Sequence, residues 1–155
     1  MTRLCCDVLS ALRAKGMTLV TAESLTGGGI GAALTAVPGA SDVFKGGVIS
    51  YVDQVKEEVL GVSKGGLDCY GAVSAQTAEA MAIGVRKLLR SDVAVSVTGL
   101  AGPGGDEFGH EVGTVFIGFS AQTATMVEEC HFEGNREEVR NQTIAAALRL
   151  ILSHL

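Results

Sequence analysis

A passage from a strand through a tight loop into a helix is expected at Thr21-Ala22-Glu23-Ser24-Leu25-Thr26-Gly27-Gly28-Gly29. An apolar run from Met17 to Val20 precedes it, and a glycine- and alanine-rich segment typical of a helix start follows it. A loop of small residues at this place can present a serine hydroxyl as a nucleophile, and the free N–H groups at a helix start can receive negative charge. Together with a second glycine-rich loop and one suitably placed lysine, this passage predicts an enzyme that acts on a phosphorylated small molecule.

On both sides of this passage, the apolar periodicity and the capping residues predict alternating helices and strands. We expect strands at residues 17–21, 46–52, 93–98, 112–119 and 123–132, and helices at 3–15, 28–37, 53–60, 75–90 and from 135 almost to the end. The last two strands are expected to form an antiparallel pair, and residues 64–66 and 98–111 are expected to be loops. Because helices separate strands that are apolar throughout, we predict a three-layer α/β/α sandwich with a mixed sheet.

The helix ends carry their own signals. Thr2, Ser74 and Asn135 are the expected N-caps of the first helix, the long central helix and the last helix, and Gly16 is the expected residue after the end of the first. Asn135 and Glu138 also have the spacing of a capping box.

The bulk properties limit the classes of protein. A chain of 155 residues is expected to form a single domain, 1–155, with a core of its own. No apolar run approaches the roughly 20 residues that span a bilayer, and charges interrupt the N-terminal segment where a signal peptide is apolar, so we expect a cytoplasmic protein without a membrane partner. The net charge of −5, with acids and bases interspersed, argues against nucleic acid as a partner. We also expect a homo-oligomer, most simply a dimer.

The cysteines and histidines do not predict a metal site. None of the four cysteines has CxxC spacing or lies at a metal-ligand interval from a histidine. We expect the cysteines to be buried, reduced thiols and the three histidines to lie on the surface or in loops.

Ser24, Thr26, Gly27 and Gly28 form the first candidate site. Ser24 is either a nucleophile, which needs a base within hydrogen-bond reach, or together with Thr26 a cap of the following helix. The glycine spacing at 27–32 also fits a relaxed dinucleotide fingerprint. We reject a dinucleotide-dependent hydride enzyme, because the strand is expected to end several residues earlier and no suitably placed acid clearly follows.

Tyr51 and Lys56 form the second candidate site, at the end of a strand and on the next short helix. Lys56 is either a general base with a lowered pKa or a solvated surface lysine paired with its glutamate neighbours. The acidic composition of residues 53–58 favours the surface lysine. Tyr51 is more often a core aromatic than a proton relay.

The third candidate is the loop Thr98-Gly99-Leu100-Ala101-Gly102-Pro103-Gly104-Gly105, which follows a buried strand. Its glycines let the backbone approach a ligand closely, and ligands of open α/β sheets bind at such strand ends. A functional loop is favoured over a flexible turn because the loop is long.

Arg136 and Arg140 form the fourth candidate, one turn apart at the start of the last helix. The helix macrodipole disfavours cations at this end, so the pair needs another reason. Either a phosphate or carboxylate ligand supplies it, or the two arginines pair with nearby glutamates.

As a set, these residues resemble the CinA C-terminal family, the stand-alone nicotinamide-nucleotide amidohydrolases. The resemblance follows the chain in order. The matching segments are Ala22–Gly28, Pro38–Ser41, Gly46–Tyr51, Lys56, Leu60–Val62, Gly71–Ser74, Met81–Gly84, Thr98–Gly105, Val112–Val115 and Phe132–Arg136.

This resemblance implies hydrolysis of the carboxamide of nicotinamide mononucleotide to nicotinic acid mononucleotide and ammonia, with no metal or cofactor. It implies that Ser24 is the nucleophile, Lys56 its general base and Tyr51 a close neighbour. We expect the backbone N–H groups of Thr26 to Gly28 to stabilise the oxyanion. The Thr98–Gly105 loop, through Thr98, Gly99, Gly102 and Gly105, and Arg136 or Arg140 are expected to hold the ribose phosphate.

The chain departs from the family pattern at three places. Leu25 stands where cysteine is usual, Asn135 where aspartate is usual, and the loop 105–111 lacks the usual Lys-Pro. The alternative hypothesis is therefore a nucleotide-sensing or interaction module on the same scaffold, with catalysis lost.

Overall fold

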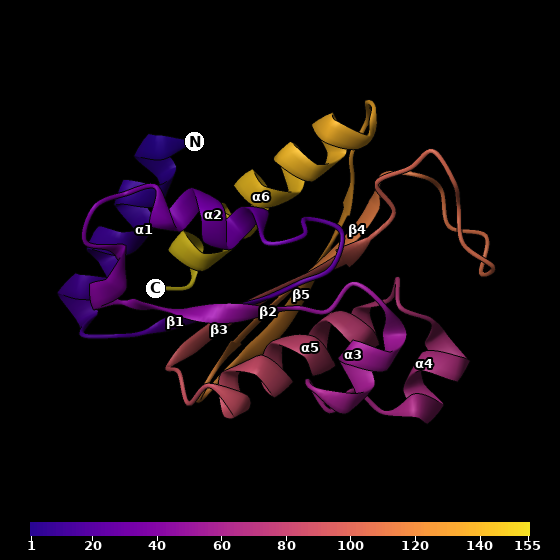
Figure 1. Cartoon of the computed structure of the whole chain (residues 1–155), viewed down its shortest axis with the longest axis horizontal. Helices are drawn as coiled ribbons and strands as arrows, with labels where there is room; N and C mark the ends of the chain where they lie inside the picture. Colours follow the sequence, from indigo (N-terminus) through magenta and orange to yellow (C-terminus); the bar gives the residue numbers. More distant parts are fainter.

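Five strands form one mixed sheet, with helices on both of its faces (Figure 1). The structure is a computed structural model and describes all of residues 1–155. The strands are β1 (Leu19–Glu23), β2 (Phe44–Ile49), β3 (Val93–Gly99), β4 (Thr114–Ala121) and β5 (Thr125–His131), in the order β2-β1-β3-β4-β5. The helices are α1 (Thr2–Lys15), α2 (Gly29–Thr35), α3 (Asp53–Glu58), α4 (Lys64–Tyr70), α5 (Ala75–Leu88) and α6 (Arg136–Ser153), with a short 3₁₀ turn at Ala40–Asp42.

The layers confirm the predicted α/β/α sandwich. Helices α1, α2 and α6 cover one face of the sheet, and α3, α4 and α5 lie on the other (Figure 1). Strand β1 pairs in parallel with β2 and β3, whereas β4 is antiparallel to both β3 and β5. The sheet is therefore mixed, and the expected antiparallel pair of the last two strands is present.

Alternation along β3 shows why the central strands are apolar throughout. Val93, Val95 and Val97 belong to the larger core cluster, which includes side chains of α1, α2 and α6. Ala94 belongs to a second cluster, with Met81 and other side chains of the opposite layer. Successive side chains of a strand point to opposite faces, so a strand covered on both faces needs apolar residues at every position.

The sequence prediction missed helix α4. Residues 64–66 were expected to be a loop, but α4 begins there, with the Ser63 side chain accepting a hydrogen bond from Gly66 N at 3.0 Å. Two glycines in the first turn lower the helix propensity, which obscured the helix in the sequence. None of the six helices combines the length and the apolarity needed to cross a membrane.

Some element boundaries differ from the prediction by a few residues. Strand β1 extends to Glu23 rather than ending at Thr21, because Ala22 and Glu23 still pair with both β2 and β3. The predicted cap at Thr2 is wrong, since Met1 precedes α1 and Thr2 is already helical. Gly16 does adopt the expected left-handed conformation after α1, with φ of 63°.

The other two predicted caps are present. The side chains of Ser74 and Asn135 accept hydrogen bonds from Thr77 N at 3.1 Å and Glu138 N at 2.9 Å. The four cysteines are free, but the expectation that all are buried is wrong, since Cys69 is exposed on α4.

Candidate active site

The carboxyl ends of the three parallel strands assemble the candidate site. Ser24 follows β1 directly, Tyr51 is the second residue after β2, and Thr98 and Gly99 end β3. Because β1 pairs in parallel with both other strands, these ends lie at one edge of the sheet, where the chain continues to opposite faces from β1 and β2. Open α/β sheets bind ligands at such an edge.

A cavity of about 570 Å³ opens at this edge. The residues that line it are Ser24, Leu25, Tyr51, Asp53, Lys56, Ala72, Val73, Thr98, Gly99, Leu100, Ala101, Gly102, Pro103, Gly104, Asp106 and Arg136. The volume lies in the range of small-molecule sites, about 300–1,000 Å³. The cavity therefore brings Ser24 of the first candidate site together with Tyr51 and Lys56, most of the glycine-rich loop and one of the two arginines.

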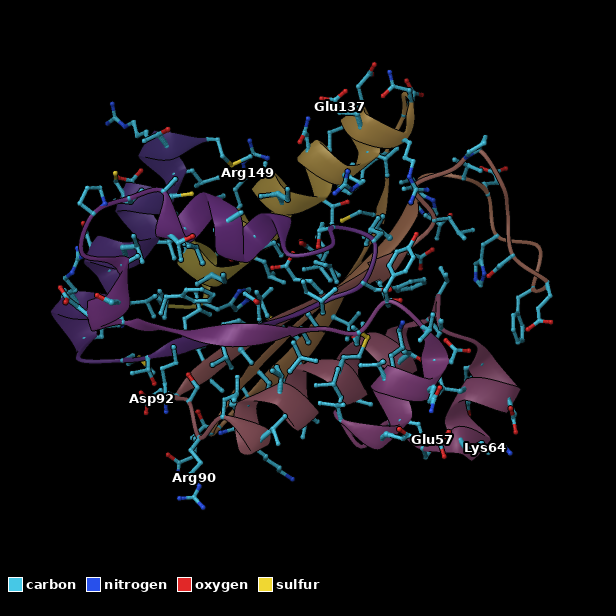
Figure 2. The ribbon with its side chains drawn as sticks, viewed as in Figure 1. Glu57, Lys64, Arg90, Asp92, Glu137 and Arg149 are labelled. Atoms are coloured by element: carbon cyan, nitrogen blue, oxygen red, sulfur yellow. The ribbon has the colours of Figure 1, made fainter.

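Lys56 and Ser24 form a buried pair in this cavity. Lys56 Nζ donates a hydrogen bond to Ser24 Oγ at 3.1 Å and another to the Ser50 carbonyl oxygen at 2.6 Å. The Lys56 side chain is 1% exposed, although it lies on the short helix α3, whose neighbouring Glu57 points outward (Figure 2). The interpretation of Lys56 as a solvated surface lysine is therefore wrong.

Burial also favours the neutral form of this lysine. Desolvation lowers the pKa of Lys56, because the charged ammonium loses hydration, and the Asp53 carboxylate partly opposes this by raising it. The lowered pKa makes the neutral amine, which can accept a proton, more accessible near neutral pH.

The turn after Ser24 uses most of its polar groups internally. Gly27 N donates to the Ser24 carbonyl oxygen at 3.1 Å, and Gly28 N donates to Glu23 Oε2 at 3.1 Å. Thr26, Gly27 and Gly28 do not line the cavity. The expectation that the N–H groups of Gly27 and Gly28 receive a ligand charge is therefore corrected, because acceptors in the chain already occupy them.

Two N–H groups of the same turn do not have such acceptors. Leu25 N and Thr26 N donate no hydrogen bond within the chain, whereas Ser24 N donates to Val97 O at 3.1 Å. Leu25 also lines the cavity, with its side chain 4% exposed and part of the larger core cluster. Leu25 therefore joins the core beside Ser24 while it also lines the cavity.

Tyr51 lies against an arginine rather than in the core. Its side chain is 58% exposed, and its hydroxyl accepts a hydrogen bond from Arg136 Nη2 at 3.0 Å. Arg136 Nη1 donates to the Gly102 carbonyl oxygen at 2.7 Å. Arg136 thereby connects the segment after β2 to the glycine-rich loop across the mouth of the cavity.

The two arginines at the start of α6 have different surroundings. Arg140 donates from Nε to Leu25 O at 3.0 Å and from Nη2 to Thr26 O at 3.1 Å, and it does not line the cavity. Neither Arg136 nor Arg140 forms an ion pair with a glutamate. Glutamate pairing therefore does not explain them, and of the two only Arg136 faces the site.

The glycine-rich loop lines the far wall of the cavity. Thr98 Oγ1 donates to Ala72 O at 2.7 Å, and a Cβ on Gly99 would lie 2.6 Å from Thr114 O, so only glycine fits there. Gly102 lines the cavity with Thr98 and Gly99, whereas Gly105 does not. The backbone N–H groups of Ala101 and Gly102 donate no hydrogen bond within the chain.

Two acidic residues of the cavity were missed from the sequence. Asp53 begins α3, and Asp106 accepts hydrogen bonds from His110 N at 2.9 Å and contacts His110 Nδ1 at 2.6 Å. The i,i+4 spacing of Asp106 and His110 was a usable signal, while Asp53 offered none beyond its place at a helix start. No group of three or more His, Cys, Asp or Glu side chains lies together as a metal site requires.

Comparison with known proteins identifies the family. The model of the CinA C-terminal domain matches residues 2–155. The chain belongs to the CinA C-terminal domain family. A putative competence-damage inducible protein of Bacillus subtilis is 46% identical over 154 residues, and one of Caldanaerobacter subterraneus subsp. tengcongensis is 44% identical over 148 residues. These matches cover 99% and 96% of this chain but 37% and 36% of the relatives, so the chain spans just over a third of their length.

Solved CinA structures share the fold over almost the whole chain. The CinA superfamily protein ECK1530/EC0983 of Escherichia coli superposes with a TM-score of 0.97 at 33% identity, covering 99% of this chain and 90% of that one. A competence/damage inducible protein of Agrobacterium tumefaciens gives a TM-score of 0.94 at 36% identity, covering 98% and 93%. The CinA C-terminal fold is therefore the scaffold on which Ser24 and Lys56 meet.

Proposed function

We propose that this CinA-family chain is a serine–lysine amidohydrolase that hydrolyses the carboxamide of nicotinamide mononucleotide. The products are nicotinic acid mononucleotide and ammonia, and the reaction uses no metal or cofactor. The observation that carries the proposal is the buried contact of 3.1 Å between Lys56 Nζ and Ser24 Oγ inside the cavity. A serine needs a base at this distance to act as a nucleophile.

The acylation step follows from this pair. Neutral Lys56 takes the proton of Ser24 Oγ while that oxygen attacks the amide carbon, forming a tetrahedral intermediate. Lys56 then gives the proton to the amide nitrogen, the C–N bond breaks, and ammonia leaves behind an ester on Ser24. The Ser50 carbonyl oxygen, which accepts a hydrogen bond from Lys56 Nζ at 2.6 Å, keeps the amine aimed throughout.

Deacylation reuses the same groups. A water molecule attacks the ester carbon while Lys56 accepts its proton, and the proton returns to Ser24 Oγ as the ester bond breaks. The acid product leaves, and Ser24 and Lys56 regain their starting states.

The oxyanion needs donors that the chain has not used. Leu25 N and Thr26 N have no acceptor within the chain, and they directly follow the nucleophile. We propose Leu25 N, whose residue lines the cavity, as the oxyanion donor in place of Gly27 N and Gly28 N, whereas Thr26 does not line the cavity. Each such donor contributes about 3–4 kcal/mol to the stabilisation of the transition state.

The charges around the cavity suit a zwitterionic nucleotide. Arg136 and the N–H groups of Ala101 and Gly102 are the proposed contacts of the phosphate. Asp53 and Asp106 lie on the cavity wall, where carboxylates favour a cationic pyridinium ring. Arg140 supports the serine turn from behind through its bonds to Leu25 O and Thr26 O.

We further propose that the chain forms a homo-oligomer. Edge strand β2 is paired on one side alone, and Ile49 at its end and the nearby Val52 are both more than half exposed. Such a surface is suited to a partner copy.

The test is ammonia release from nicotinamide mononucleotide by the purified protein in EDTA. Ser24→Ala and Lys56→Ala are expected to abolish release. Ser10→Ala and Lys64→Ala, which change an exposed serine of α1 and an exposed lysine of α4, serve as matched controls and are expected to retain it. Binding without release by the wild type would instead support the nucleotide-sensing or interaction module.

A further inference from the structure

A buried carboxylate lies directly beside the nucleophile and takes no part in the steps above. Glu23 ends β1, and its side chain is 1% exposed. It forms no ion pair with any lysine, arginine or histidine. Acidic side chains are seldom buried to this degree, since an ionised carboxylate out of water is costly unless hydrogen bonds compensate it.

Four hydrogen bonds provide the compensation. Oε2 of Glu23 accepts from Thr26 Oγ1 at 2.6 Å, from Gly28 N at 3.1 Å and from Ile30 N at 3.0 Å. Its Oε1 accepts from Gly31 N at 2.9 Å. Three of these donors are N–H groups at the start of α2, which have no partner within the helix. The negative charge also lies at the favourable end of the helix dipole.

The carboxylate therefore closes the serine turn from within. The turn begins at Glu23, the last residue of β1, and ends at Gly29, the first residue of α2. The Glu23 side chain accepts hydrogen bonds from the N–H groups of Gly28 and Ile30 at the far end of the turn. The N–H groups of Gly28, Ile30 and Gly31 are therefore already paired and do not offer free donors to an external anion. This arrangement also leaves Leu25 N and Thr26 N as the groups of the turn without an acceptor.

The backbone of Glu23 is connected to Lys56 through Ser50. The Glu23 carbonyl oxygen accepts from Ser50 N at 2.8 Å, and the Ser50 carbonyl oxygen accepts from Lys56 Nζ. Glu23 is thus connected to the nucleophile by sequence and to Lys56 through Ser50. A change in the Glu23 side chain is expected to move both members of the pair.

We propose that Glu23 is a positioning residue, whose carboxylate fixes the turn that carries Ser24 and aims its hydroxyl at Lys56. The proposal rests on the proposed amidohydrolase function for its kinetic consequence, while its structural consequence stands separately. Misplacement of a nucleophile by about 1 Å costs on the order of a hundredfold in rate.

The test compares Glu23→Gln with Glu79→Gln, the same change on an exposed glutamate of α5. The glutamine keeps one oxygen acceptor, but its amide group confronts N–H donors, so the turn loses part of its support. We expect a folded protein in which the amides of Gly28, Ile30 and Gly31 exchange hydrogen faster. We also expect kcat to fall by about tenfold or more, with KM changed less than about twofold, and no such change in Glu79→Gln.

A second variant covers the case in which Glu23→Gln fails to fold. Thr26→Val removes the hydroxyl that donates to Glu23 and keeps the shape of a fully buried side chain. A folded Thr26→Val with a lowered kcat supports the proposal. Unchanged kcat in a folded Glu23→Gln, or in Thr26→Val when the first variant does not fold, would overturn it.

The two proposals fail in distinguishable ways. If Ser24→Ala retained full activity, the amidohydrolase mechanism would fall. The hydrogen exchange of Gly28, Ile30 and Gly31 in Glu23→Gln would still decide whether the carboxylate holds the turn, and unchanged exchange would count against the positioning role.

Discussion

Arg136 donates a hydrogen bond to the Tyr51 hydroxyl at 3.0 Å, although the two residues are 85 positions apart in the chain. The same guanidinium holds the Gly102 carbonyl oxygen at 2.7 Å. A planar cation with bonds to two sides of a cavity mouth, and no carboxylate partner, is well placed to bind an anionic group of a ligand.

Loss of Arg136 is expected to weaken substrate binding more than chemistry. Arg136→Ala should raise KM for nicotinamide mononucleotide by about ten- to a hundredfold with a smaller effect on kcat, because a charge-assisted contact of about 1.5–3 kcal/mol is removed. Arg136→Lys should recover only part of the loss, since lysine lacks the fork geometry. Steady-state kinetics of both variants, with Arg149→Ala on α6 as the control, measure this. An unchanged KM in Arg136→Ala would exclude a role in binding.

The pH dependence should report Lys56. Its pKa lies below the ordinary value of about 10.4 because burial disfavours the ammonium, and the base is active only when neutral. Activity should therefore rise with pH through the Lys56 pKa and then level off. Asp53 raises that pKa, so Asp53→Asn should move the rising limb to lower pH, while Asp68→Asn on α4 should leave it in place. A shift to higher pH in Asp53→Asn would contradict this account of the lysine.

Two helical glycines should respond to alanine in opposite ways. A Cβ at Gly84 in α5 would lie 2.0 Å from the backbone oxygen of Leu60, whereas a Cβ at Gly65 in α4 meets nothing within 4 Å. Gly84→Ala should lower the free energy of unfolding by about 1–3 kcal/mol despite the better helix propensity, because of overpacking. Gly65→Ala should raise it by about 0.5–1 kcal/mol. Chemical denaturation of both variants decides this, and a stable Gly84→Ala would show that α5 can move away from Leu60.

The Asn135 cap should contribute to the free energy of unfolding. Asn135→Ala removes the acceptor of the Glu138 N–H bond and should cost about 1 kcal/mol, measured by urea unfolding. Asn135→Asp should be at least as stable as the wild type, because a carboxylate favours the helix N-terminus. A less stable aspartate variant would indicate that a neutral cap is needed beside this site.

Most of the fold could be predicted from local patterns. The apolar runs typical of strands and the caps at Ser74 and Asn135 are short-range signals. From them the α/β/α layers and the mixed sheet could be predicted. Helix α4 was not predicted, because two glycines lower the helix propensity of its first turn. Ser63 and tertiary packing nevertheless stabilise it.

Some residues of the candidate site could likewise be predicted from local patterns, whereas others depend on tertiary contacts. The composition of the sequence was enough to single out Ser24 and the glycine-rich loop. The buried position of Lys56, in contrast, involves contacts with Ser24 and Ser50, which are 32 and 6 positions away in the chain. On the residues alone, the acidic neighbours of Lys56 favoured a surface role. The resemblance to a known family implied a basic role for Lys56, and the structure shows this lysine buried with its Nζ 3.1 Å from Ser24 Oγ.

Glu23 illustrates what the pattern could not show. Glu23 lies within the serine motif, yet three of the four donors to its carboxylate are backbone N–H groups, which no sequence pattern displays. The same applies to Arg140, whose partners are the carbonyl oxygens of Leu25 and Thr26.

The Arg140 contact links events that are far apart in time during synthesis. The carbonyl oxygens of Leu25 and Thr26 emerge from the ribosome early, and their guanidinium partner follows 115 and 114 residues later. A nascent chain that stops before α6 carries the serine but lacks the group that holds its turn from behind. The Ser24 turn therefore gains these two hydrogen bonds only once the last helix has docked.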